Sequence, residues 1–193
     1  MIPGYSLSSI AVPSSFLYGD SLVVSATTDY EMGGVDLNDP SQGLNATLWR
    51  MDIVGDNLVL SKNGTDPINY INAPGTTEVS FAFDQLMNPF VTYVQNGQAK
   101  YYWYDTSISG YATTNLPSGA LTPRASLDDK REISTLLGQS DIILSYILNN
   151  NLCVRVQRER YLTEHILGTN VNVVLVNTGM STVNRFQFQI TPL

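Results

Sequence analysis

The sequence feature that most constrains the fold is an internal repeat of seventeen residues at an offset of 53 positions. The first copy, residues 89–105, reads PFVTYVQNGQAKYYWYD, and the second, residues 142–158, reads IILSYILNNNLCVRVQR, with no gap between them. In each copy, two apolar or aromatic runs flank a short Asn- and Gly-containing segment, and these residues tolerate the positive φ of tight hairpin turns. Each copy is therefore predicted to be a β-hairpin, and the pair to be similar units of one fold.

The alignment keeps the parity of the strands, so the same face is predicted to be apolar in both copies. That face carries Ala99, Tyr101 and Trp103 in the first copy and Leu152, Val154 and Val156 in the second. Tyr102, Tyr104 and Cys153 are then predicted to point outward. Outward tyrosines suit a protein interface or stacking on a sugar ring, whereas aromatic packing across strands within the sheet is the plainer interpretation.

Short strand-like segments separated by turn signals continue through the rest of the chain. Alternating or continuous apolar patterns occur at 49–53, 58–60, 79–83, 173–176 and 186–190, and turn signals at 55–57 and 177–179. The expected fold class is all-β, built mainly from antiparallel hairpins, as a β-sandwich or a partial propeller-like sheet. At most one short helix is expected, because Ser126 and Asp129 have capping-box spacing and Gly138 follows as a stop signal. Residues 158–167 are predicted to be a strand.

Two regions are expected from the distribution of turn residues. Residues 1–44 are rich in Ser, Gly, Pro and Asp, and are predicted to form an irregular N-terminal arm or loop with one strand at 21–26. This segment is either an arm that wraps a neighbouring subunit or a plain surface loop. Residues 45–193 are predicted to form a single β domain that contains the hairpin repeat.

The charge of the chain limits its partners. Charged residues make up 14 % of the sequence and the net charge is −7, which argues against direct binding of nucleic acid. Residues 1–99 carry −8 and residues 100–193 carry +1, an asymmetry that is either incidental or suited to head-to-tail packing of subunits. The sequence shows neither a signal-peptide pattern nor an apolar run long enough to span a membrane, so synthesis in a cytoplasm is expected.

No catalytic constellation is recognisable in the sequence. The chain has one histidine, His165, and one cysteine, Cys153, which cannot provide a four-ligand zinc site or a disulfide. Adjacent Asp128 and Asp129 lack the spacing of a calcium loop. We therefore predict a protein that is not an enzyme and that has no metal or cofactor, although a cleft with paired carboxylates, as in a glycosidase, stays open.

Basic and acidic residues gather in the second half of the chain and predict an ion-pair network, within the chain or across an interface. Arg is the more frequent base, and its planar guanidinium suits carboxylate pairing. The candidate interface residues are Tyr102, Tyr104, Arg124, Asp128, Asp129, Lys130, Arg131, Arg158 and Arg160.

Residues 88–167 resemble a module in virion proteins of tailed bacteriophages. The resemblance lies in the two hairpins, the Pro123-Arg124 pair with the block at 128–131 (DDKR) between them, and the Arg160-Tyr161 pair that closes the second hairpin. It covers under half of the chain. The resemblance implies a structural subunit in the tail or neck of the virion, made in the cytoplasm of a bacterial host, without catalytic activity.

Three functions are carried forward from the sequence. The first is a structural virion protein that binds other virion proteins and copies of itself in a homo-oligomer. The second is a receptor- or glycan-binding module at the tail, with a host surface glycan as its partner. The third is a glycoside-degrading enzyme. The first two differ in whether Tyr102 and Tyr104 are buried on assembly or line an open groove.

Overall fold

The structure is a computed structural model that describes residues 14–18, 21–25, 30–36, 47–62, 65–84, 86, 88–128, 141–180 and 186–193. Of residues 14–48, 65, 66, 128 and 180 it describes the backbone alone. Strands dominate throughout this part of the chain, and the one helical element in it is a single 3-10 turn, η3 (Gln157–Glu159). The predicted all-β class with antiparallel pairing is confirmed.

The strands form four antiparallel sheets, each a meander of consecutive strands. Sheet A contains β1 (Ser14–Tyr18), β2 (Ser21–Ser25), β3 (Tyr30–Asp36), β4 (Thr47–Val54), β5 (Asn57–Lys62) and β6 (Thr65–Asn72). Sheet B contains β7 (Thr76–Phe83), β8 (Pro89–Gln95), β9 (Gln98–Asp105) and β10 (Gly110–Asn115). Sheet C contains β11 (Leu121–Asp128), β12 (Asp141–Leu148), β13 (Asn151–Val156) and β14 (His165–Gly168). Sheet D contains β15 (Val173–Met180) and β16 (Phe186–Pro192).

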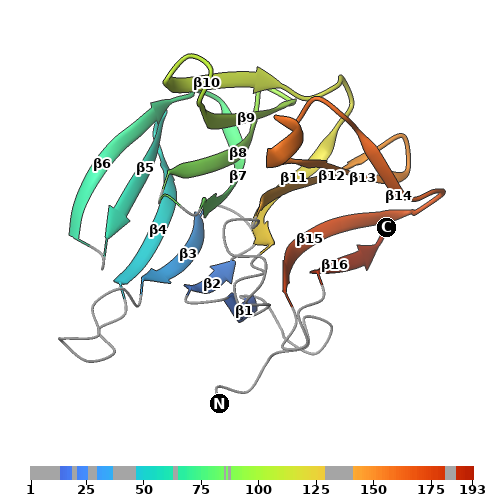
Figure 1. The fold of residues 1–193 in the computed structure, drawn as a ribbon, viewed down its shortest axis with the longest axis horizontal. Helices are drawn as coiled ribbons and strands as arrows, with labels where there is room; N and C mark the ends of the chain where they lie inside the picture. The colour runs from blue at the N-terminus through green and yellow to red at the C-terminus, as the bar shows by residue number, and fades with distance from the viewer. Residues whose placement is uncertain are drawn as a thin grey trace.

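The four sheets follow one another around an arc, with β3, β7, β11 and β15 on its inner side (Figure 1). These inner strands contact each other in that order, and β1 lies against β15. Neighbouring sheets pack face to face as in a sandwich, and the packing is repeated from one sheet to the next.

The two predicted hairpins have the same register. Gln95 pairs with Gln98 and Leu148 with Asn151, so each hairpin closes on a two-residue turn at equivalent positions. Asn96 and Gly97 have φ of 50° and 76° in the first turn, and Asn149 and Asn150 have φ of 50° and 59° in the second. Positive φ at both turn residues matches the twist of the strands, which explains why Asn and Gly occupy these positions.

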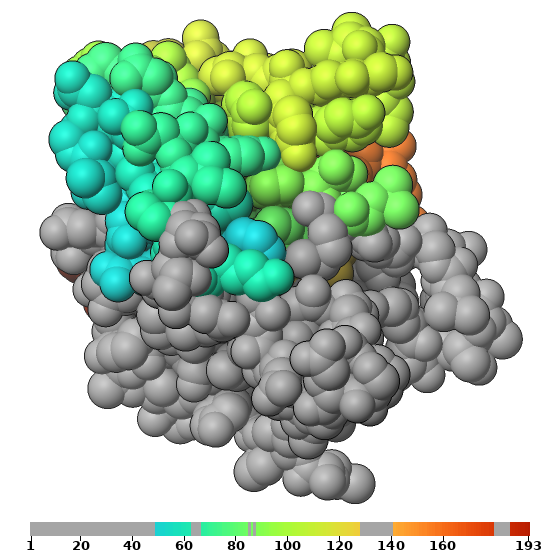
Figure 2. All heavy atoms as spheres, turned by 90° about the vertical axis from the view of Figure 1, so that its left-hand side faces the viewer, coloured from blue at the N-terminus to red at the C-terminus, as the bar shows by residue number. Residues whose placement is uncertain are grey.

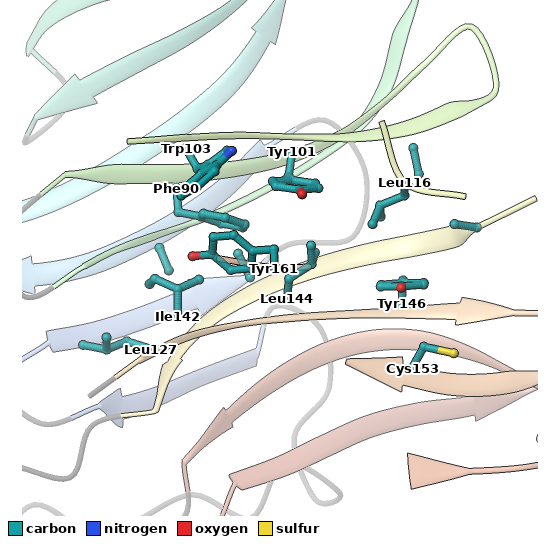
Figure 3. Packing of buried hydrophobic residues seen from close by; sticks show 14 residues of the cluster. Phe90, Tyr101, Trp103, Leu116, Leu127, Ile142, Leu144, Tyr146, Cys153 and Tyr161 are labelled. Carbon is teal, nitrogen blue, oxygen red and sulfur yellow. The ribbon is translucent and has the colours of Figure 1, made fainter. Parts of the chain in front are cut away.

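Opposite faces of the two hairpins meet in the core. Phe90, Tyr101 and Trp103 of the first hairpin pack against Leu144 and Tyr146 of the second (Figure 3). Leu144 and Tyr146 align with Val91 and Tyr93 of the first hairpin. Val91 and Tyr93 face the other way, into a second core that is shared with sheet A. That second core contains Val91, Tyr93, Phe81, Met51 and Leu58. The hairpins are therefore successive layers, and each has one face toward the preceding sheet of the chain and one face toward the next.

The structure corrects four local predictions. Cys153 was predicted to point outward, but it is buried beside Tyr146, because its side of β13 faces sheet B. Ser126 lies in strand β11 rather than at a helix start, and its hydroxyl donates to the Thr178 carbonyl oxygen at 2.8 Å. The predicted turn at 177–179 belongs to β15, where tertiary pairing overrides the turn residues. Residues 158–167 are strand only in β14.

The described part of residues 1–44 contains three strands, where the sequence predicted one. The predicted strand at 21–26 corresponds to β2. β1 and β3 pair on either side of it, and β3 continues into β4, so the described part of this region joins sheet A. Most of the predicted helix after Ser126 lies outside the described residues, at 129–140.

Candidate interaction surface

Four tyrosines from sheets A and B form a cluster on the outer strands, which we call the tyrosine cluster: Tyr70, Tyr102, Tyr104 and Tyr111. The Tyr102 and Tyr111 rings stack in parallel with centroids 4.9 Å apart. The Tyr104 ring meets Tyr111 edge-on at 5.3 Å, and the Tyr70 ring of β6 meets Tyr102 edge-on at 5.5 Å. The cluster therefore combines aromatic packing within sheet B with a contact between two sheets.

The cluster extends from the core to the surface, since Tyr70 and Tyr102 pack against the core shared by sheets A and B. Tyr111 is 36 % exposed, and exposed isoleucines lie near it in sequence on both sheets: Ile68 on β6 and Ile108 in the turn before β10. Figure 2 shows this side of the molecule, where the atoms of β5 and β6 adjoin those of β10 in one continuous surface. An aromatic and aliphatic surface of this kind is typical of a contact site for a macromolecule.

The environment of the cluster raises the pKa of two of its phenols, Tyr70 and Tyr102. Burial, reinforced by the neighbouring Tyr111 and Tyr102, raises the pKa of Tyr70 far above its ordinary value. Burial and the Tyr111 phenol also raise the pKa of Tyr102. The Tyr70 hydroxyl is buried without a hydrogen-bond partner among the described residues, which leaves one polar group of the cluster unsatisfied.

Of the predicted interface residues, Arg124 is mostly buried and makes its contacts within the chain. Its Nε donates to the Val176 carbonyl oxygen of β15 at 2.8 Å, and its Nη1 lies 3.2 Å from Glu78 Oε2 of β7. Arg124 thus connects three inner strands, β7, β11 and β15. Because the side chain is only 12 % exposed, these contacts position the sheets rather than present a charge to a partner.

Arg158 and Arg160 lie at the junction of sheets B and C, and each is about half exposed. Arg158 pairs with Asp141 at the start of β12 through its Nε and its backbone N–H. Arg160 Nη2 lies 2.9 Å from both carboxylate oxygens of Asp105 and 2.7 Å from the Ser107 hydroxyl, across the junction on sheet B. The predicted ion-pair network is therefore present within the chain at these two arginines.

Tyr161 is the central residue of the same junction, and sequence reasoning gave it no role beyond the resemblance. Its ring packs against Phe90, Tyr101 and Trp103 of sheet B with centroids 4.8, 5.4 and 5.2 Å away (Figure 3). Arg160 and Tyr161 both have positive φ, 53° and 59°, a conformation that non-glycine residues rarely adopt twice in succession. This kink turns Tyr161 inward while Arg160 reaches Asp105.

A second buried network lies behind Tyr161 on sheet C. Tyr146 donates from its hydroxyl to Glu164 Oε2 at 2.5 Å and accepts from Arg155 Nε at 2.9 Å. Arg155 also donates to the Tyr161 carbonyl oxygen at 3.0 Å, which fixes the kinked segment. Burial, followed by the bond to Glu164, raises the pKa of Tyr146 well above its ordinary value.

The remaining predicted interface residues are not placed. Asp128 is described by its backbone alone, as the last residue of β11, and Asp129, Lys130 and Arg131 lie outside the described residues. Tyr70 and Tyr111 were missed by the sequence interpretation. Tyr111 pairs with Tyr104 across β9 and β10, so the hairpin pattern held a signal for it, whereas Tyr70 comes from another sheet.

Within the described ranges, no group of three or more His, Cys, Asp or Glu side chains is placed to hold a metal ion. His165 Nε2 lies 2.7 Å from Glu159 Oε2, and the hydrogen bond to His165 lowers the pKa of Glu159. Cys153 lies apart from this pair, with its sulfur 3.7 Å from the Asn151 carbonyl oxygen. The described chain has no helix that is long and apolar enough to cross a membrane.

Comparison with known proteins gives no relatives: no family model, no curated protein and no solved structure matches this chain.

Proposed function

We propose that this chain is a structural subunit of a tailed-bacteriophage particle, in the tail or neck, that acts by binding other virion proteins and copies of itself. The observation that carries the assembly role is the tyrosine cluster, a partly exposed aromatic surface that extends over two sheets. The placement in a phage virion rests on the resemblance of residues 88–167 to the tail-protein module. No catalytic role forms part of the proposal.

The physical argument for a protein contact starts from the composition of this surface. Tyrosine supplies a large contact area and loses little conformational entropy on binding, which makes it one of the residues that contribute most at interfaces. The exposed side chains of Ile68 and Ile108, 56 % and 62 % exposed, would gain from removal from water.

Glycan binding at the tail is the second candidate, because an exposed aromatic ring is also what a sugar stacks on. Tyr111 is the tyrosine of the cluster with the most exposed side chain. However, Tyr102 is stacked in parallel on one face of the Tyr111 ring, and Tyr104 meets the ring edge-on. Little free ring face is left for a sugar, and this favours the protein contact.

The proposal is tested by the molar mass of the purified chain, measured by light scattering after gel filtration. We expect a discrete multimer that dissociates in the double variant Ile68→Ser, Tyr111→Ser. The matched control is Val54→Ser, which changes an equally exposed aliphatic residue that lies outside the cluster and should leave the multimer intact. Circular dichroism verifies that each variant is folded.

A monomer at all concentrations would contradict self-assembly through the cluster. Binding of the monomer to a glycan array, with loss of binding in Tyr111→Ser, would establish the second candidate instead. A multimer that is unchanged in the double variant would show that another surface makes the contact.

A further inference from the structure

A small pocket lies at the junction of sheets B and C, beside the buried Tyr161 ring. Its walls come from the turn between β7 and β8, from β9, from the start of β12 and from η3 with the residues that follow. The lining residues that matter are Asp84, Phe90, Trp103, Tyr104 and Tyr161. The pocket has room for a group of about the size of one water molecule.

One side of the pocket carries an unpaired negative charge. Asp84 Oδ1 accepts the backbone N–H groups of Leu86 and Asn88 at 2.9 and 2.8 Å, and Oδ2 accepts Asn88 Nδ2 at 3.0 Å. Gln157 Nε2 lies 3.4 Å from the same Oδ2. These donors hold the carboxylate in place, but none of them neutralises it, and no cationic side chain of the described residues pairs with Asp84.

The other carboxylates at this junction are already neutralised. Asp141 pairs with Arg158, and Asp105 pairs with Arg160. Asp84 therefore leaves a net negative charge beside the pocket. Burial raises the pKa of Tyr161, and the nearby carboxylates of Asp84 and Asp141 raise it further.

The pocket is otherwise lined largely by aromatic side chains. The Tyr161 side chain is 1 % exposed, and its hydroxyl has no hydrogen bond within the described part of the chain. Trp103 Nε1, on another lining residue, is also buried without a partner there. Figure 3 shows the hydroxyl oxygen between Phe90 and Ile142, both of which line the pocket. A hydroxyl that borders a pocket and has no protein partner is able to accept a hydrogen bond from a ligand or a water molecule.

We propose that this pocket binds a primary ammonium group. The positive charge would lie against the Asp84 carboxylate, with an N–H donated to the Tyr161 hydroxyl oxygen and the aromatic rings around it, an arrangement that favours cations. An ammonium nitrogen is close to water in size, so it fits, whereas a guanidinium or a quaternary ammonium group does not. The pocket shares Tyr104 with the tyrosine cluster, but ammonium binding goes beyond the proposed function.

The test uses the full chain and nuclear magnetic resonance of the indole N–H groups. The protein has two tryptophans, so Trp103 reports on the pocket and Trp49, in the core between sheets A and B, is an internal reference. Methylammonium chloride is the probe. We expect a saturable shift of the Trp103 signal with methylammonium and none with tetramethylammonium or guanidinium chloride at the same concentrations.

Two variants separate recognition from a loss of fold. Asp84→Asn removes the charge and should weaken methylammonium binding at least about ten-fold, the size expected for a hydrogen bond to a charged group. Tyr161→Phe keeps the ring and removes the hydroxyl, and should weaken binding by a smaller factor. Asp56→Asn, in the exposed turn between β4 and β5, is the matched control and should bind as the original chain does.

Several outcomes would overturn the proposal. A Trp103 signal that stays fixed, or that responds equally to all three cations, would mean that the pocket holds only an ordered water. Unchanged binding in both variants would also contradict it, and Tyr161→Phe decides if Asp84→Asn fails to fold. Nα-acetyl-lysine methylamide distinguishes the source of the group: binding as tight as methylammonium indicates a lysine side chain, and weaker binding a free amine.

Discussion

The guanidinium group of Arg160, in the turn between β13 and β14 of sheet C, lies 2.9 Å from both carboxylate oxygens of Asp105 on sheet B. One nitrogen, Nη2, makes both contacts and also reaches the Ser107 hydroxyl, so a single cation joins the ends of two sheets. The residue that follows Arg160 is Tyr161, the ring that fills the space between the same two sheets. Charge at the rim and aromatic packing in the core therefore come from adjacent residues.

The Asp105 carboxylate predicts a loss of stability in acid. The Ser107 hydroxyl, the Ser107 backbone N–H and Arg160 lower the pKa of Asp105 in the folded chain. The stabilisation is therefore present above the ordinary carboxyl pKa of about 3.9 and is lost as the pH falls through the lower folded value. We expect the urea midpoint to fall less steeply with acid in Asp105→Asn than in the original chain. Equal slopes would exclude this carboxylate as a source of the acid sensitivity, and Asp56→Asn is the control.

Truncation of Tyr161 should be among the most destabilising changes in the protein. Tyr161→Ala removes a fully buried ring with three aromatic neighbours, and a loss of about 3–5 kcal/mol in the free energy of unfolding is expected. The matched control is the next residue, Leu162→Ala, whose side chain is 77 % exposed and should change stability little. Urea denaturation measures both. Similar values for the two variants would mean that sheets B and C do not depend on this ring.

Two glycine substitutions should have opposite signs. Gly97→Ala places a side chain at φ of 76° in the first hairpin turn and should cost about 1–2 kcal/mol. Gly110→Ala meets nothing closer than 3.8 Å and requires no positive φ, so it should be neutral or stabilise by up to about 1 kcal/mol. Thermal unfolding of the two variants, measured side by side, tests this. Equal destabilisation would indicate that space, rather than φ, limits both sites.

Removal of the Tyr70 hydroxyl should leave stability unchanged or raise it by up to about 1 kcal/mol, because the group is buried without a partner. The pKa of Tyr70 is raised in the folded chain, so its contribution is present below the ordinary phenol pKa of about 10 and is lost as the pH rises above that value. Tyr70→Phe should therefore unfold at a higher alkaline pH. Destabilisation at neutral pH would show that the hydroxyl has a partner, for example an ordered water.

The thiol of Cys153 should react only when the chain opens. Its side chain is 1 % exposed, and burial, followed by the negative charge of Glu164, raises the pKa of the thiol. Because the thiolate is the reactive form, modification by an aromatic disulfide reagent should be slow in the folded chain and fast in urea. Rapid reaction of the folded chain would mean that β13 is accessible.

The hairpins were predictable from sequence because their information is local. Asn96-Gly97 and Asn149-Asn150 specify the turns, and strand parity fixes which residues share a face. The sequence could not tell which face meets which neighbour, since both faces of β8 and β12 are buried. That ambiguity produced the wrong orientation of Cys153.

The candidate sites were less predictable than the fold, because they are assembled from distant segments. Tyr102 and Tyr104 were identified, but Tyr70 joins them from a strand about thirty residues earlier, through sheet packing alone. Asp84 lines the same pocket as Tyr161, which comes 77 residues later in the chain. Pairing of strands can be read from local pattern, whereas contacts between sheets depend on the complete fold.

The back-to-front packing of the two hairpins has a consequence for how such a chain could have grown. If equivalent faces of the two hairpins packed together, both would be buried in the pair, and a third copy could not pack in the same way. Here opposite faces meet, so a further copy of the hairpin layer could stack in the same way and lengthen the molecule without a new kind of interface. The sequence of each layer could then change, as long as the two faces that pack against each other stayed complementary.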